Sequence, residues 1–231
     1  MTAPNPSTPV DTRHRVRLLL PALLVVTLAY PISLLHPAAA VAYALCYVGI
    51  FALGARVASV TRRRTVAATG VAATISLLVV PWTLWPNVLW LALVTYILFI
   101  VFHVLVMVAI GGYLLEAPEV DRDVIFAGTS LYVLVGNLFI PAAMLVDRLS
   151  VELTGASAYA GGPVAWPDMA YFSFVTLTTL GYGDIAPVNP VSQAMAIAEA
   201  ILGVLTVALI IGRLVGAAAG VRRRHEREHD A

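Results

Sequence analysis

Six apolar runs, each long enough to cross a lipid bilayer, dominate this sequence. They cover about residues 17–36, 38–60, 66–85, 88–115, 124–147 and 191–219. A membrane-spanning helix needs about 20 apolar residues, and a helix satisfies its own backbone hydrogen bonds inside the bilayer. Hydrophobic residues make up 60% of the chain and charged residues 12%, well outside the composition of a soluble domain. The sequence therefore predicts an all-α membrane protein with six transmembrane helices.

Arginine clusters indicate how the six runs are oriented. The clusters precede the first run, separate the second from the third, and follow the sixth, so an even number of runs lies between any two clusters. The positive-inside rule then places all three clusters in the cytoplasm. We expect a multi-pass protein of the plasma (cell inner) membrane with cytoplasmic N- and C-termini. The arginines are Arg13, Arg15, Arg17, Arg56, Arg62, Arg63, Arg64, Arg222, Arg223 and Arg224.

The first forty residues leave one alternative open. Arginines, an apolar stretch and three consecutive alanines imitate the three regions of a secretory signal peptide. Cleavage there would leave five spans and the same cytoplasmic C-terminus. Otherwise residues 1–16 are predicted to be a disordered cytoplasmic N-terminus, because proline, serine and threonine are frequent in it.

The stretch TLTTLGYGDIAP, residues 176–187, matches two kinds of motif. GYGDIA fits the G-x-G-x-x-A turn of dinucleotide-binding proteins, which needs a helix directly after the glycines and a βαβ unit around them. Pro187 and Pro190 interrupt that helix, and the chain has no second strand–helix alternation. A phosphate-binding loop is excluded as well, because the chain contains no lysine. We therefore expect no nucleotide, nucleic-acid or cofactor binding, and no enzyme activity.

The alternative is an apolar element that enters the membrane and returns. Trp166, Pro167 and Asp168 are typical of a helix start, and the helix predicted over 168–178 is too short to cross a bilayer. Its C-terminal end carries the negative end of the helix dipole, which favours a nearby cation. Gly181 and Gly183 permit backbone angles that turn successive carbonyls the same way. A ring of such carbonyls can replace the water shell of a potassium ion.

The segment TLGYGD, residues 179–184, resembles the T-V-G-Y-G-D signature of the tetrameric potassium channels, with Leu in place of Val. The overall pattern is most similar to bacterial six-span potassium channels that lack a working voltage sensor. The resemblance covers residues 124–219 and implies an outer helix at 124–147, a pore helix at 168–178, a filter at 179–184 and an inner helix at 191–219. It further implies a homotetramer, because one filter loop supplies a quarter of each ring. The implied K⁺-binding residues are Thr179, Leu180, Gly181, Tyr182 and Gly183.

The resemblance also implies which residues support the filter. Asp184 is expected to accept a hydrogen bond from Tyr171. Phe172 replaces a residue that donates to the filter tyrosine in many relatives, so we hypothesise a less rigid filter. Val175 and Thr178 complete the predicted support.

Three residues of the inner helix are gating candidates. Gly203 falls where the family has its hinge glycine, although a small residue there also suits close helix packing. Glu199 is an acid inside a predicted span, which makes it either a proton- or ion-sensitive element or a protonated or hydrogen-bonded link to a pore-helix hydroxyl such as Thr176 or Ser173. Gly212 lies where voltage-gated relatives place a Pro-x-Pro bend.

The remaining segments indicate a channel without strong voltage gating. Residues 17–115 resemble a voltage-sensor bundle, but the fourth run contains no arginine, and His103 is expected to be a packed histidine. A short cytoplasmic linker is predicted at 116–123 and a cytoplasmic tail at 220–231. The sequence thus predicts a passive potassium-selective channel in the lipid bilayer. The alternative is a less selective cation channel or the pore subunit of a potassium-uptake assembly.

Overall fold

The computed structural model describes residues 9–57, 62–85, 87–117 and 120–229, and its regular elements are helices. Apart from one isolated bridge between Tyr159 and Pro187, no β-structure is present in these residues. This agrees with the predicted all-α class. The elements are α1 (Pro9–Leu28), a short 3₁₀ helix η1 (Tyr30–Leu34), α2 (Pro37–Val57), α3 (Arg62–Leu84), α4 (Leu89–Glu116), α5 (Arg122–Thr154), α6 (Trp166–Leu177) and α7 (Pro190–His229).

Five of these helices are long and apolar enough to cross a membrane. They contain the stretches Ala38–Val57, Val66–Leu84, Leu89–Glu116, Arg122–Thr154 and Pro190–Gly216. The apolar part of α1, Arg17–Leu28, is shorter than a span. Pro31 explains why: its ring disfavours a continuing α-helix, and the chain goes on as η1 instead. The first of the six predicted spans, residues 17–36, is therefore not established by the described helices.

The helices also extend beyond their predicted ends. α1 begins at Pro9, so the prediction that all of residues 1–16 is disordered is wrong for 9–16, where a proline in the first turn suits a helix start. α5 continues past residue 147 to Thr154, and Gly155 ends it with a left-handed φ of 73°. α7 continues past residue 219 to His229. Residues 1–8 of the predicted N-terminus, Pro118 and Glu119 of the linker, and residues 230–231 of the tail lie outside the described part.

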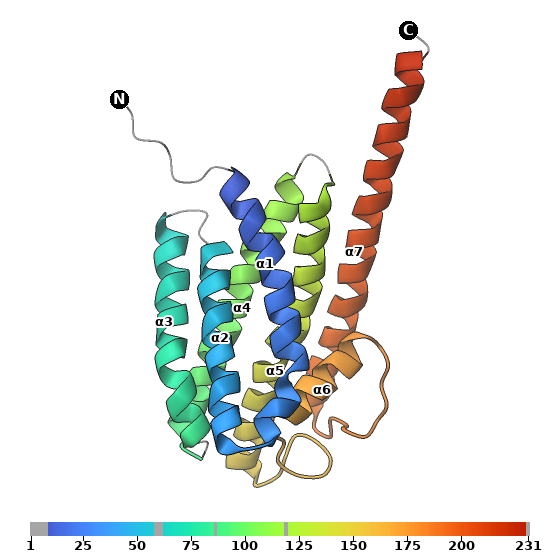
Figure 1. The fold of residues 1–231 in the computed structure, drawn as a ribbon. Helices are drawn as coiled ribbons and strands as arrows, with labels where there is room; N and C mark the ends of the chain where they lie inside the picture. The colour runs from blue at the N-terminus through green and yellow to red at the C-terminus, as the bar shows by residue number, and fades with distance from the viewer. Residues whose placement is uncertain (1–8, 58–61, 86, 118–119, 230–231) are drawn as a thin grey trace, which may run out of the picture.

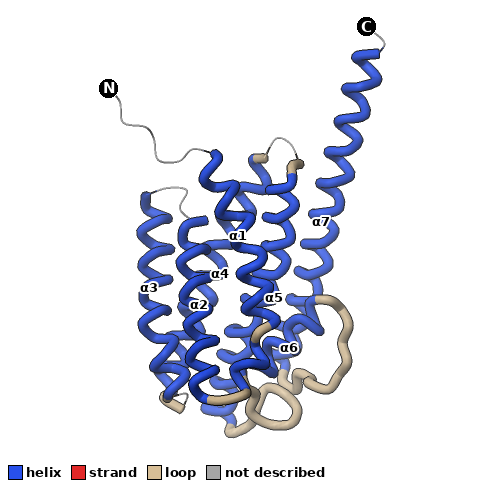
Figure 2. The backbone as a smooth tube through the Cα atoms, in the orientation of Figure 1, coloured by secondary structure: helices blue, strands red, loops and turns tan. Residues whose placement is uncertain are grey.

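Figures 1 and 2 show the helices as a bundle with one long arm. α1 to α4 run side by side, and both α1 and α4 pack against α5 of the same chain. α6 is short, packs against α5 and α7, and has loops on both sides of it (Figure 2). α7 extends beyond the bundle at the end where α1 begins (Figure 1).

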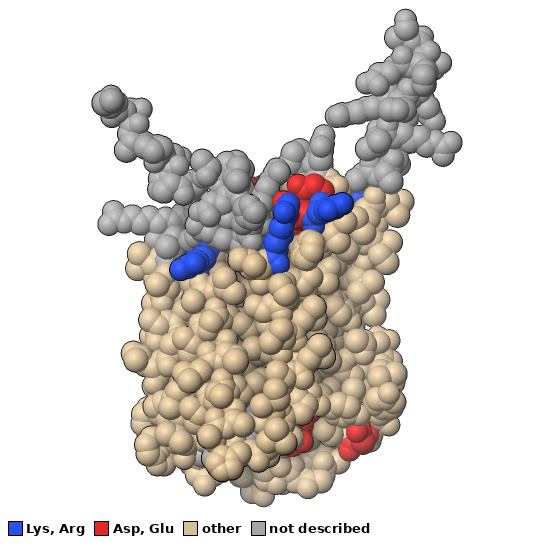
Figure 3. Space-filling view, in the orientation of Figure 1, with Lys and Arg blue, Asp and Glu red and all other residues tan. Residues whose placement is uncertain are grey.

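Charged side chains are absent from the middle of the molecular face shown in Figure 3. On that face the described arginines gather at the end where α1 begins, and acidic side chains lie near both ends (Figure 3). A broad uncharged band between charged ends is expected for a protein that crosses a bilayer.

Aromatic rings fill the core of the bundle. The Phe51 ring lies edge-on to Phe99 and to Phe102, with ring centroids 4.8 Å apart in both pairs. Trp166, the first residue of α6, extends this cluster, with its ring centroid 5.4 Å from that of Phe99 and 5.5 Å from that of Trp82. The start of the short helix is thereby anchored in the bundle.

Polar contacts join α1 to α5 as well. Arg17 forms an ion pair with the buried carboxylate of Asp123, near the start of each apolar stretch. Further along, Asn137 Nδ2 donates to Thr27 Oγ1 over 3.0 Å. These contacts fix the bundle against the helix that precedes the candidate site.

Candidate functional site

The short helix α6 positions the loop that follows it. Asp168 Oδ2 accepts from the Ala165 amide over 2.8 Å and so caps the helix start. At the other end Thr178 Oγ1 donates to the Phe174 carbonyl over 2.6 Å. With 12 residues, α6 is about half as long as a membrane span requires. The chain therefore does not cross a membrane through α6. After Leu177 it returns toward the end of the bundle at which α6 begins (Figure 1).

Residues 179–184, the predicted filter, form a loop that we call the filter loop. The backbone of this loop changes handedness from residue to residue. Thr179, Gly181 and Gly183 have positive φ angles of 59°, 57° and 79°, whereas Leu180 and Tyr182 between them do not. In an ordinary strand, successive carbonyls point in opposite directions. Alternating handedness lets them point to one side. Glycine adopts positive φ without strain, but a β-branched threonine does so at a cost, so Thr179 has to be held in place.

Hydrogen bonds to the end of α6 hold the first half of the filter loop. The Val175 carbonyl accepts from the amides of Leu180 and Gly181, over 2.9 and 3.2 Å. The Thr179 amide donates to the Thr176 carbonyl over 2.9 Å. Val175 thus supports the loop through its backbone. In the single chain, the side chains of Leu180 and Tyr182 are 55% and 66% exposed, so one face of the loop is open.

The connection between α5 and α6 holds the segment after the filter loop. The Ala160 amide donates to the Ala186 carbonyl, and the Val188 amide donates to the Ala158 carbonyl, each over 2.9 Å. Asp147, buried near the end of α5, accepts from the Ala158 amide over 2.9 Å. The sequence prediction missed Asp147. Its only signal was an acid at the end of an apolar run.

Tyr171 on α6 lies beside the filter loop. Its ring stacks on that of Tyr182, with centroids 6.5 Å apart and planes 6° from parallel. The Tyr171 hydroxyl interacts with the Asp184 carboxylate, and this interaction is the main reason that the pKa of Tyr171 is raised to about 12. Because this pKa lies far above 7, the Tyr171 phenol is protonated at neutral pH. The structure thus brings Tyr171, Tyr182 and Asp184 together.

Phe172 packs against a different part of the chain. Its ring is buried and lies edge-on to Tyr159 in the α5–α6 connection, with centroids 5.3 Å apart. Within one chain, Phe172 is therefore a packing residue between α6 and that connection. Its predicted effect on filter rigidity stays a prediction.

Glu199 on α7 is buried against α6, and its carboxyl forms a hydrogen bond with the Ser173 hydroxyl. The same hydroxyl lies 2.7 Å from the Gly136 carbonyl of α5. His103, the other titratable residue considered in a predicted span, lies in α4, where its Nδ1 is 2.7 Å from the Phe99 carbonyl. Glu199 therefore lies against the short helix α6, whereas His103 belongs to the bundle.

The two glycines of α7 that were predicted to act in gating have different surroundings. A Cβ added at Gly203 would collide with the Leu177 carbonyl oxygen and lie 2.9 Å from Leu177 Cδ1. A Cβ added at Gly212 would meet nothing within 4 Å. α7 passes through both positions as one helix. Gly203 thus allows α7 to approach the end of α6 closely, whatever its role in gating.

A comparison with protein families finds a match in the part of the chain that holds this site. The family model described as an ion channel matches residues 124–219. Two pore potassium channel a of Oryza sativa subsp. japonica is 34% identical over 84 residues, which cover 36% of this chain and 21% of that protein. A Rhodopseudomonas palustris protein provisionally named a potassium channel protein is 35% identical over 60 residues, which cover 26% of this chain and 15% of that protein.

Protein LctB of Geobacillus stearothermophilus is 37% identical over 95 residues, which cover 37% of this chain and 70% of LctB. The likeness to the rice and Rhodopseudomonas proteins therefore spans about a fifth of their length or less, whereas the likeness to LctB spans most of it. No solved structure matches the chain.

Proposed function

The chain belongs to the ion-channel family, and we propose that four copies of it form a pore that conducts potassium ions passively across the membrane. The observation that carries this proposal is the alternating backbone of the filter loop, with positive φ at Thr179, Gly181 and Gly183. The ion-binding groups are the carbonyls of residues 179–183 and the Thr179 hydroxyl. The names of the rice and Rhodopseudomonas relatives support potassium as the permeant ion.

The open face of the filter loop supports a homotetramer. Irregular backbone at membrane depth needs protein or water-filled space around it, and Leu180 and Tyr182 are exposed in the single chain. The apolar stretch of α7 is also only 17% buried, against 50% for that of α5. Three further copies around a fourfold axis would cover both surfaces and complete each carbonyl ring.

The positions of the arginines determine the orientation in the membrane that we propose. The end of the bundle where α1 begins faces the cytoplasm, because arginines are retained on that side of a plasma membrane. The α5–α6 connection and the far end of the filter loop then face outward. Because α4 contains no arginine, we propose that opening is at most weakly voltage-dependent. Conductance that rises steeply and saturates with voltage, equivalent to several charges per chain, would contradict this.

Reversal potentials in lipid bilayers test the proposed function. The purified protein under a potassium/sodium gradient should give a reversal potential close to that of potassium. A reversal potential near zero would instead indicate a less selective cation channel, and the absence of current would favour a subunit of a larger potassium-uptake assembly. Gly181→Ala should abolish the current, because its φ of 57° disfavours a side chain. Gly112→Ala, at an α4 position with free space around it, is the matched control.

A further inference from the structure

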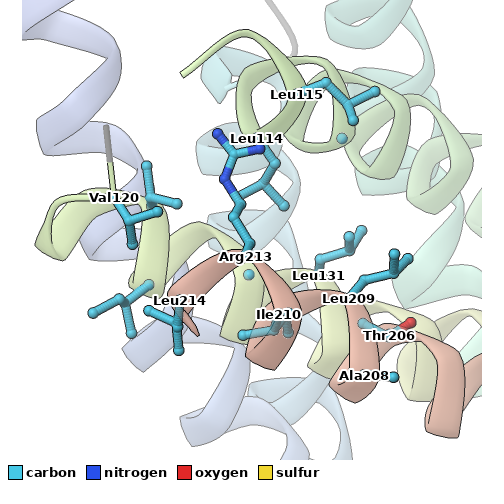
Figure 4. Close-up of a pocket in the computed structure, with 15 residues that line it drawn as sticks. Leu114, Leu115, Val120, Leu131, Thr206, Ala208, Leu209, Ile210, Arg213 and Leu214 are labelled. Carbon is cyan, nitrogen blue, oxygen red and sulfur yellow. The ribbon is translucent and has the colours of Figure 1, made fainter. Parts of the chain in front are cut away.

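A cavity of about 530 Å³ opens between the end of α4, the start of α5 and α7. Its walls are mainly leucine, isoleucine, valine and glycine, and Figure 4 shows Leu114, Leu131 and Leu209 among them. The Thr206 hydroxyl in the wall is already bonded to the Leu202 carbonyl over 2.7 Å. Among the described residues that line the cavity, Arg213 alone is charged.

The guanidinium of Arg213 is only partly satisfied. It extends from α7 to a place between Leu114 and Val120 (Figure 4), and its Nη2 donates to the Ala117 carbonyl over 2.5 Å. Its Nε is buried and has no hydrogen-bond partner among the described residues. A guanidinium has five N–H donors and is always charged, so a buried one favours an anion beside it. Within the described part of the chain, no carboxylate forms an ion pair with Arg213.

The cavity lies where the apolar spans end. Arg213 bonds to the carbonyl of Ala117, which directly follows α4, and Leu115 is next to Glu116, the last residue of α4. This boundary is the depth at which lipid phosphates meet their acyl chains. The occupant has to supply an anion to Arg213 and an apolar chain to the leucines. An apolar helix of a neighbouring subunit would fill the walls but leave Nε without a partner.

We propose that this cavity binds an anionic glycerophospholipid, whose phosphate accepts from Arg213 and whose acyl chain lies along the leucine wall. Both phosphatidylglycerol and phosphatidylcholine offer a phosphate that accepts a charge-assisted hydrogen bond. The choline cation of phosphatidylcholine would lie near the Arg213 guanidinium, so like-charge repulsion favours phosphatidylglycerol over this zwitterionic lipid with the same chains. Because Arg213 also binds the Ala117 carbonyl, the bound lipid would contact both α7 and the joint between α4 and α5. The proposal does not depend on which ion the pore conducts.

Native mass spectrometry of the full chain in detergent tests the charge requirement. Phosphatidylglycerol should bind about tenfold more tightly than phosphatidylcholine with the same acyl chains. Arg213→Gln should remove most of that preference. Arg148→Gln is the matched control, because Arg148 also donates to a backbone carbonyl, that of Asn87 over 3.1 Å, but does not line the cavity. Equal binding of the two lipids, or an unchanged preference in Arg213→Gln, would overturn the proposal.

A second pair of variants tests the apolar wall without altering the charge. Gly111 lines the cavity and Gly112 does not, although both positions have free space around an added Cβ. Gly111→Leu should weaken the binding of both lipids several-fold, whereas Gly112→Leu should leave it unchanged. Equal lipid binding by the two variants would contradict the assignment. So would cross-linking of Gly111→Cys to a second copy of the chain, which would show that a neighbouring subunit covers the cavity.

Discussion

Ser173 on α6 and Glu199 on α7 form a buried hydrogen bond between these two helices. The Ser173 hydroxyl is also 2.7 Å from the Gly136 carbonyl of α5. A hydroxyl carries a single hydrogen, so it cannot donate to the carboxylate and to the carbonyl together. Both contacts are hydrogen bonds at the same time only when the Glu199 carboxyl is protonated and donates to Ser173. The site then joins three helices at one point.

This geometry predicts that Glu199→Gln preserves the fold and the conduction. The glutamine amide can donate to Ser173 while Ser173 donates to Gly136. Glu199→Ala removes the donor and leaves a void beside the hydroxyl, at a cost of about 1–3 kcal/mol in unfolding free energy. Thermal unfolding and potassium flux of the purified variants measure both effects. A folded but non-conducting Glu199→Gln would show that conduction needs an ionised carboxylate. A pH response that persists in this variant would exclude Glu199 as the proton sensor.

Gly203→Ala should be far more damaging than Gly212→Ala. The new methyl at position 203 meets the Leu177 carbonyl oxygen, so α6 or α7 has to shift, at a cost of about 1–3 kcal/mol and with displacement of the filter loop. At position 212 the methyl has free space, and the better helix propensity of alanine adds up to about 1 kcal/mol of stability. Thermal unfolding and potassium flux compare the pair. Equal tolerance at both positions would refute the close approach at Gly203.

Tyr171→Phe should loosen the filter loop, because it removes the hydroxyl that interacts with Asp184. That interaction raises the pKa of Tyr171 from an ordinary value of about 10 to about 12, so the protonated phenol is favoured in the folded state. Its contribution is therefore fully present below about pH 10 and is lost as the pH rises through about 12. Slow inactivation of the current measured from neutral to alkaline pH should accelerate in the wild type, whereas Tyr171→Phe should start fast and change little.

Phe172→Trp tests the hypothesis that the predicted filter is less rigid because position 172 has no hydrogen-bond donor. An indole N–H at this position would supply the donor that phenylalanine cannot, so we expect slower inactivation and higher potassium selectivity. Phe172 is buried against Tyr159, so the larger ring also has to be accommodated there. Phe172→Leu, which changes the packing without adding a donor, separates the two effects. Unchanged inactivation and selectivity in Phe172→Trp would refute the hypothesis of a less rigid filter.

Much of the fold was predictable because long apolar runs and glycine spacing are local properties of a sequence. The helical class and the short helix before the filter loop followed from such patterns, and α6 at Trp166–Leu177 lies within two residues of the predicted 168–178. The start of α1 was missed, because a segment rich in proline, serine and threonine resembles a disordered tail. The end of α1 at Leu28 depends on Pro31, which is hard to weigh inside an apolar run.

The contacts around the filter loop were less predictable, because they join residues far apart in the sequence. Glu199 was identified as an acid inside a span, yet its bond to Ser173 depends on how closely α7 approaches α6 at Gly203. Asp147 was not identified at all, because its role appears only when the α5–α6 connection folds over it. Arg213 likewise becomes informative only once its buried Nε and the apolar cavity are seen together.

Trp166 provides the last prediction, because it anchors the short helix α6 in the aromatic core of the bundle. Its ring contacts those of Tyr47, Trp82 and Phe99, so Trp166→Ala removes contacts between two parts of the chain. The ring is partly buried, and we expect a loss of about 2–3 kcal/mol, below the ~3–5 kcal/mol typical of a fully buried ring. Trp90→Ala, at an α4 position that is 65% exposed, should cost about 0.5 kcal/mol or less. Because α6 leads directly into the filter loop, Trp166→Ala should also speed inactivation, whereas Trp90→Ala should not. Equal stability and equal currents in the two variants would show that the bundle does not support α6.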